Sequence, residues 1–404
     1  MGLLAGSSLI KSGTTVAYTE NIRNMNKETF ESRLDAYIRD HTSGNYMISP
    51  LSFRFALGLL LSGTAGKTRD ELLSILGAES MEESERICKS FLGFALTFQN
   101  DFLKETEEFR KYAAKGWIEE DAPTPFRALR VANAIWERDD LGNVFKDSFR
   151  HAVTEKYDAE CGSFSVSDAA EKINTWADQK TEGMIERILP EDFDAEDIES
   201  ILTNALYFKD SWLDAFDEED SFTGKFTTEA GSTVQKDYMT RTSDFAYYED
   251  TETRLVSLPM NGGVGMAFVL GKMDDFPRKL TEASYCPVQI TIPKIEVETS
   301  LSNGELTGFL VDNGVRSAFD PESADFSLMT ERRMVIDDII QKTKLKLDEE
   351  GVEAAAVTVI SARGGCLPDR REPVIFTADR PFSFFIYADT DPEPVIMFSG
   401  RISE

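Results

Sequence analysis

The chain has 404 residues, of which 41% are hydrophobic, and its 43 basic and 72 acidic residues give a formal net charge of −29. This length can bury the core of one large domain or two ordinary ones, and the charge argues against nucleic acids and anionic membranes as partners. The only histidines are His41 and His151, too few for histidine-based catalysis or a zinc site, so we expect no metal and no cofactor.

Residues 1–25 are expected to be a flexible or partly ordered lead-in. Apolar residues occur near the start, but no basic segment precedes them, which makes this a poor secretory signal. No apolar run approaches the roughly 18 residues that span a bilayer, so we expect no transmembrane segment.

The first third of the chain predicts helices. Apolar residues at helical spacing predict helices over 26–38 and 52–61. Thr68 is expected to cap the start of a helix over 70–76, which Gly77 would end.

The middle of the chain changes from helices to strands. Residues 104–127 are highly charged, with two prolines near their end, which predicts a helix extension followed by an exposed connection. Short apolar segments bounded by turn residues then predict buried strands over 131–136, 201–208, 255–260 and 266–270. This mixture predicts an α+β protein.

Signatures of common enzymes are missing from the sequence. It contains no GxSxG, GxxxxGK[ST] or HExxH motif. The glycine-rich stretch 261–265 would place Phe268 where a dinucleotide-binding fingerprint needs its last glycine, so we interpret it as a hairpin turn. Ser8 and Lys11 fit SxxK but lack the motifs that accompany it in enzymes. We therefore expect a protein that is not an enzyme.

The four cysteines, Cys88, Cys161, Cys286 and Cys366, are scattered and form no CxxC pair. This spacing predicts neither a disulfide scaffold nor a zinc knuckle, and we expect most of the thiols to be buried. Cys366 falls in a polar stretch, where an exposed thiol would be open to oxidation. Such a thiol is typical of a reducing setting or of a prokaryotic secreted protein. We favour a secreted or cell-surface location, with the cytoplasm as the alternative.

The C-terminal part contains a long segment between strands. Strand patterns occur over 342–347, 374–376, 382–387 and 395–398. Between the first two, an acidic turn leads into a run of small residues over 352–360 and then a polar stretch over 361–372. We expect an exposed loop over about 349–373.

The small residues of 352–360 have a geometric consequence. In a strand, Val352, Ala354 and Ala356 would share one face, and Glu353 would lie on the other. Small inward side chains would let such a strand enter an existing sheet over a packed core, where large or charged ones would clash. Local propensity alone also allows an alanine-rich helix from 349 to about 356.

Several separated motifs follow one another along the chain: NYMISPLS at 45–52, NTW at 174–176 with TEGMI at 181–185, TNALYFK at 203–209 with Trp212, the segment 376–382, and FSGR at 398–401. In content and order they resemble the motifs of the serpin family, and the resemblance covers the chain from about residue 26 to 404. The resemblance implies a single domain over 26–404 with three β-sheets, about nine helices and a reactive loop, in an inhibitory, prokaryotic-type member.

The resemblance also implies a function. A target serine protease would cleave the loop and be trapped as an acyl-enzyme when the loop inserts into the main sheet. The hinge that inserts first matches Glu349, Glu350, Gly351, Val352, Glu353, Ala354, Ala355 and Ala356. Alternatives are a non-inhibitory member with a binding or chaperone-like role, or an inhibitor of cysteine proteases. We expect a monomer whose partner is a protease.

The region where the main sheet must part, called the shutter, matches Ser49, Ser52 and Asn204. Gln341 stands where the family usually has histidine. An amide can donate and accept hydrogen bonds, but it does not become charged between pH 5 and 8. A pH-dependent opening of the sheet is therefore not expected from this position.

The breach, at the top of the sheet, matches Trp212, Lys294 and Glu349, and the last two are expected to form an ion pair. Met184 and Asp210 replace the usual lysine and glycine of the family. We expect both to alter only local turns.

Two bonds of the loop are candidates for cleavage. The family's usual spacing of about fourteen residues from the hinge glycine predicts the Gly365–Cys366 bond, which suits an elastase-like or subtilisin-like protease. The Arg363–Gly364 bond is the alternative, because a guanidinium suits the acidic pocket of a trypsin-like protease. Counting back from Pro381 instead reaches positions from Leu367 to Arg370.

Overall fold

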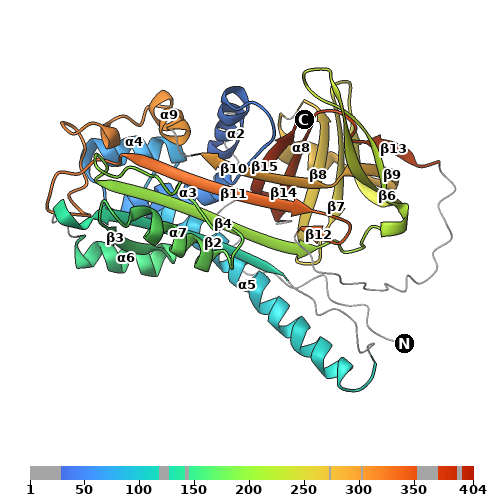
Figure 1. Ribbon diagram of the computed structural model, residues 1–404, viewed down its shortest axis with the longest axis horizontal. Coiled ribbons are helices and arrows are strands. Elements are labelled where there is room, and N and C mark those ends of the chain that lie inside the picture. Colours follow the sequence, from blue (N-terminus) through green and yellow to red (C-terminus); the bar gives the residue numbers. More distant parts are fainter. Residues whose placement is uncertain are drawn as a thin grey trace.

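The computed structural model describes residues 29–117, 127–141, 145–272, 274–301, 304–352, 372–388 and 394–404. Eight α-helices and two hydrogen-bonded β-sheets lie within these ranges, so the expected α+β class is confirmed. Most helices surround one sheet, and the second sheet lies at the other end of the molecule (Figure 1).

The predicted N-terminal helices begin where the sequence supplies caps. α2 (Phe30–His41) and α3 (Pro50–Ser62) follow Thr29 and Ser49, whose side-chain oxygens accept hydrogen bonds from backbone N–H groups of the first turn. Pro50 suits the first helical position because its fixed φ is already helical and its missing N–H would have no partner there. Nearly all of α3 is buried, because it lies between a sheet and other helices.

α4 (Gly66–Leu76) begins earlier than predicted. The prediction that Thr68 caps this helix is wrong. Thr68 lies buried in the first turn, and its hydroxyl accepts a hydrogen bond from Asp325 N at 3.0 Å. Gly77 does end the helix, in the left-handed conformation with φ of 66° that favours glycine.

α5 (Met81–Ala113) is 33 residues long and projects from the rest of the described chain (Figure 1). The predicted helix extension is present up to Ala113, whereas 118–126 of the predicted connection lie outside the described residues. No helix in the described ranges is long and apolar enough to cross a membrane. The remaining helices are α6 (Asp147–Tyr157), α7 (Ala169–Lys180), α8 (Phe276–Glu282) and α9 (Glu305–Asp312).

The six-stranded sheet brings together segments that are distant in the sequence. Its order is β10 (Ile295–Leu301), β11 (Asp338–Leu347), β12 (Gly351–Val352), β4 (Ser200–Ser211), β2 (Ala128–Arg138) and β3 (Glu160–Phe164). β4 is buried along almost its whole length, because α3 packs on one face and α7 covers part of the other. The predicted strands over 131–136, 201–208 and 342–347 are therefore confirmed.

The second sheet has nine strands. In the order of pairing they are β1 (Tyr46–Ile48), β15 (Val395–Ile402), β14 (Phe382–Ala388), β8 (Val264–Gly271), β7 (Thr253–Pro259), β6 (Thr233–Glu249), β9 (Ser284–Pro293) and β13 (Val374–Thr377), with β5 (Phe222–Thr227) paired to β6. Three sheets were expected, but two of them are continuous here. The reason is that β6 is 17 residues long and pairs with β5, β7 and β9 along different parts of its length.

The glycine-rich stretch 261–265 connects β7 to β8, as predicted for a hairpin turn. The thiols differ from expectation. Cys88 is buried, but Cys161 and Cys286 are only half-buried, while Cys366 lies outside the described residues. The two half-buried cysteines lie on β3 and β9 near the edges of the sheets, where burial is incomplete.

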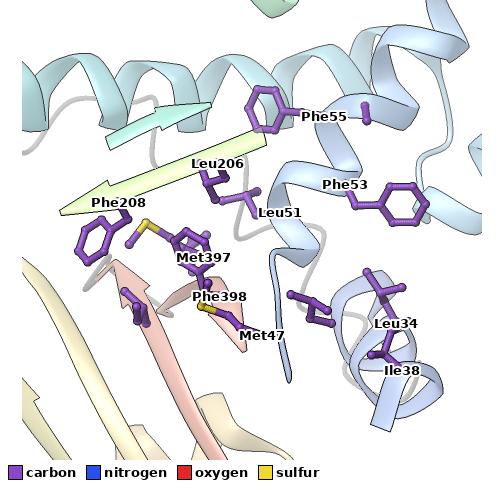
Figure 2. Packing of buried hydrophobic residues seen from close by; sticks show 14 of the residues in the cluster. Leu34, Ile38, Met47, Leu51, Phe53, Phe55, Leu206, Phe208, Met397 and Phe398 are labelled. Atoms are coloured by element: carbon purple, nitrogen blue, oxygen red, sulfur yellow. The ribbon is translucent and has the colours of Figure 1, made fainter. Parts of the chain in front are cut away.

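The core joins the two sheets through α3. Figure 2 shows Leu51 of α3 next to Leu206 of β4, with Phe208 of β4 and Met397 and Phe398 of β15 close by. Phe208 and Phe398 lie 6.1 Å apart between ring centroids. The residues that line the inner face of β4 are therefore large and closely packed.

Candidate functional site

A two-residue strand, β12, occupies one end of the space between β4 and β11. Val352 pairs with Leu347 of β11 on one side and with Asp210 of β4 on the other, and Gly351 pairs with Ser211. All four of Val352, Leu347, Asp210 and Gly351 are buried. We call the end of the sheet that holds this strand the β12 end.

Beyond β12, β4 and β11 pair directly and run parallel, from Ile201 opposite Asp338 to Ala205 opposite Lys342. Gln341 lies opposite Asn204 in this paired region. Six residues further along each strand, Leu347 and Asp210 flank Val352. The two strands thus keep one register on both sides of the transition, so a longer strand could enter after sideways separation without sliding.

Gly351 is required where β12 begins. Its φ is 143°, and a Cβ atom there would lie 2.4 Å from the Asp210 carbonyl oxygen and 2.6 Å from Ser211 Cα. Any side chain would therefore collide with the β4 backbone. The glycine lets the chain turn from the acidic residues 348–350 into the sheet.

The three predicted breach residues meet at the β12 end. Lys294 Nζ lies 2.8 Å from Glu349 Oε1, so the expected ion pair is present. Trp212 is buried, its indole donates a hydrogen bond to the Asp348 carbonyl at 3.1 Å, and its backbone N–H donates to Glu350 O at 2.9 Å. These contacts tie residues 348–350 to β4 and to the start of β10.

Glu349 is held in its ionised form. Burial raises the pKa of this carboxyl, but hydrogen bonds from Lys294 and Ser221 outweigh burial and leave the pKa below its usual value.

A cavity of about 580 Å³ lies next to the ion pair of Lys294 and Glu349, and Lys236, Lys294 and Lys346 are among its lining residues. In the described ranges, no group of three or more histidine, cysteine, aspartate or glutamate side chains could hold a metal ion.

The four predicted shutter residues form one buried hydrogen-bonded cluster between α3, β4 and β11. Ser49 accepts a hydrogen bond from Ser52 N at 3.1 Å and donates to the Met397 carbonyl at 2.8 Å. Asn204 donates to the Ser52 carbonyl at 3.0 Å. Gln341 donates to the Asn204 side-chain oxygen at 2.7 Å, which links the two strands directly.

Gln341 satisfies its whole amide within this cluster. Its oxygen accepts from Ser49 N at 3.0 Å, and its nitrogen donates to Ser49 O at 3.0 Å as well as to Asn204. The cluster contains no titratable group. That agrees with the expectation from the amide, while the role of these residues as a shutter stays a prediction.

Asn133 of β2 completes the cluster and was missed by sequence reasoning. Its side-chain oxygen accepts a hydrogen bond from Asn204 at 2.6 Å, and it is buried. A lone amide in the otherwise apolar run 131–136 was the available signal, because buried amides require partners.

Asp210 does not lie in a local turn, so that expectation is wrong. It is a buried residue of β4, and its carboxylate accepts hydrogen bonds from Gly262 N at 2.9 Å and Ser211 N at 3.0 Å. Burial raises its pKa to about 7, against the opposing influence of these hydrogen bonds and of Arg127. Met184 does follow a turn, half-buried against the cluster that contains Trp176.

Most of the predicted reactive loop lies outside the described residues. This applies to the hinge residues Glu353, Ala354, Ala355 and Ala356 and to the candidate bonds Gly365–Cys366 and Arg363–Gly364. Glu349, Glu350, Gly351 and Val352 are the hinge residues that the structure places, and all four lie at the β12 end.

The chain is similar to known proteins. A family model described as "Serpin (serine protease inhibitor)" matches residues 26–404. An uncharacterised serpin-like protein of Methanosarcina acetivorans is 31% identical over 293 residues, which are 68% of this chain and 67% of that relative.

Two solved structures share the fold. Serpin48 of the insect Tenebrio molitor, described as a highly specific serpin, has a TM-score of 0.72 at 24% identity and covers 98% of this chain and 99% of its own. Human thyroxine-binding globulin, complexed with thyroxine, has a TM-score of 0.75 at 19% identity, covering 97% of this chain and 99% of its own. At these identities the likeness concerns the fold alone.

Replacing Asn204 with alanine is expected to destabilise the protein by ~2–4 kcal/mol, because partners on α3, β2 and β11 would lose hydrogen bonds while still buried. Urea unfolding measures this change. Asn313→Ala is the matched control, since that half-buried amide makes one hydrogen bond to its own helix. Equal losses in both variants would contradict a special role of the cluster.

Asp210→Asn is expected to stabilise the protein at pH 8. The folded-state pKa of about 7 lies above the ordinary 3.8, so the contribution of this group to stability declines as pH rises from about 4 through about 7. Asparagine removes that loss, for a net gain of ~2 kcal/mol after one weakened backbone hydrogen bond. Melting temperatures at pH 5 and pH 8 test this. The gain should vanish at pH 5, and an equal effect at both pH values would refute it.

Proposed function

This chain belongs to the serpin family, and we propose that it is a suicide-substrate inhibitor of serine proteases. In this proposal a protease cleaves the loop after residue 352, and the freed segment extends β12 through the sheet while the acyl-enzyme is still attached. The observation that carries the proposal is that β12 already lies between β4 and β11, in a register that a longer strand can continue.

The inward side chains of such a strand would meet large neighbours. Continuing the register of β12 by two residues places Ala354 between Leu345 and Phe208, both buried on the inner face. A methyl group adds little volume beside these side chains, whereas a large side chain would have to displace the packed core. The small size of the inward hinge residues therefore suits the inner face of the sheet, where they would lie after insertion.

Further along, the same register places Thr358 between Gln341 and Asn204. The hydrogen bond between these two amides must break when a strand passes. A threonine hydroxyl can both donate and accept, so it can restore partners to the separated amides. This supports a shutter role for the cluster.

The protease is proposed by class. Cleavage of Gly365–Cys366 would suit an elastase-like or subtilisin-like enzyme, and cleavage of Arg363–Gly364 a trypsin-like one. What happens to the loop after cleavage distinguishes an inhibitor from a non-inhibitory member of the family. A non-inhibitory member of the family would release the protease and gain no stability.

Mixing the protein with elastase, subtilisin and trypsin is expected to give, with at least one of them, a covalent complex that survives SDS electrophoresis. Mass analysis of the released fragment identifies the cleaved bond. Cleavage without complex by every protease, together with no rise in melting temperature after cleavage, would indicate the non-inhibitory alternative. A complex with a papain-like enzyme only would indicate cysteine protease inhibition.

A pair of hinge variants tests insertion itself. Ala354→Glu would place a charge against Leu345 and Phe208, so it is expected to convert the inhibitor into a substrate that is cleaved without complex. Ala355→Glu is the matched control, because the same register puts residue 355 on the outer face, where a carboxylate stays solvated. Equal complex formation by the two variants would contradict the proposed register.

A further inference from the structure

Two lysines flank the path that an inserting strand would take, one on each neighbouring strand. Lys209 precedes Asp210 in β4, and Lys346 precedes Leu347 in β11. Since Asp210 and Leu347 both pair with Val352, the next residue of a continued strand, Glu353, would lie between these lysines.

The three side chains would also share a face. Val352, Leu347 and Asp210 are buried on the inner face, and side chains alternate along a strand. Lys209 and Lys346 therefore lie on the outer face, which agrees with their greater exposure. We propose that Lys209 and Lys346 form a lysine clamp that attracts Glu353 as insertion begins and so fixes the register of the strand. This inference rests on the proposed function and names residues that would guide it.

Each lysine has acidic neighbours that would compete with Glu353. Glu296 of β10 lies opposite Lys346 in the pairing of β10 with β11. Lys209 acts on Glu350, whose pKa is nevertheless raised, by burial first and then by nearby carboxylates. Glu353 would be the one acidic residue that lies directly beside both lysines in the extended sheet.

The position of the acidic residue matters more than its presence. Of the outer-face residues that would follow, Ala355 would lie beside Lys344 and Tyr207, and Val357 beside Lys342 and Ala205. Neither carries a charge. A strand shifted by two residues would leave Glu353 beside Lys344 alone, so only the register of β12 joins the carboxylate to two cations. Opposite charges across strands stabilise pairing and like charges oppose it.

Insertion can be measured without a protease. The probe is a labelled synthetic peptide with the sequence of residues 353–362, because β12 already holds Val352 in the sheet, and its uptake by the full-length protein is followed on native gels. We expect Lys209→Glu combined with Lys346→Glu to slow uptake about tenfold, in line with two partly exposed ion pairs. A peptide with lysine in place of Glu353 should enter the wild-type protein equally slowly. It should enter the doubly substituted protein at close to the wild-type rate.

Lys344→Glu is the matched control, because it makes the same charge change on the same face of β11 but faces Ala355. It should leave the uptake of both peptides within about twofold of wild type. If wild type takes up the peptide and charge reversal has no effect, or if the exchanged charges fail to restore uptake, the clamp is refuted and the proposed function stands. If wild type takes up no peptide and forms no protease complex, the proposed function itself fails.

Discussion

The shared register of β4 and β11 is the constraint on which the rest of this structure depends. The two strands pair directly over part of their length and are separated by β12 at one end, yet corresponding residues stay level throughout. In the proposed insertion the sheet would widen by one strand without sliding, and the entering strand would replace the direct backbone hydrogen bonds that β4 and β11 lose. Beneath this pairing, α3 packs against the inner face of β4.

Two kinds of interaction hold the strands in their present arrangement. At the β12 end, the Lys294–Glu349 ion pair and the hydrogen bonds of Trp212 hold residues 348–350. Further along, a hydrogen bond between the side-chain amides of Gln341 and Asn204 joins β11 to β4. The hydrogen bond between these two amides is buried, and both the oxygen and the nitrogen of the Gln341 amide have partners. Separating β4 from β11 would therefore cost free energy unless an entering strand offered hydrogen-bonding groups in exchange.

Charge is distributed unevenly over this acidic chain. The net charge of −29 predicts a strongly negative protein, but β11 places three lysines in alternation on its outer face. Their neighbours on β10 include Glu296 and Glu298, which balance them on one side. The other side is where an entering strand would lie. Asp210 is the opposite case, a carboxylate on the inner face that burial makes costly to ionise near neutral pH.

The sequence by itself determined the class of fold, most strands, and which residues lie together in the predicted shutter and the predicted breach. Periodicity and motif order are local properties, so they are visible in the sequence alone. The predictions from sequence were wrong about the start of α4 and about the surroundings of Asp210, because Thr68 and Asp210 take hydrogen-bond partners from segments far away in the chain. Only the tertiary structure decided that Asn133 joins the shutter cluster, that β12 is seated between β4 and β11, and that two lysines flank its continuation. The pattern of one strand decides which of its side chains face the core, but which residue of a distant strand lies opposite each of them depends on how the two segments pair.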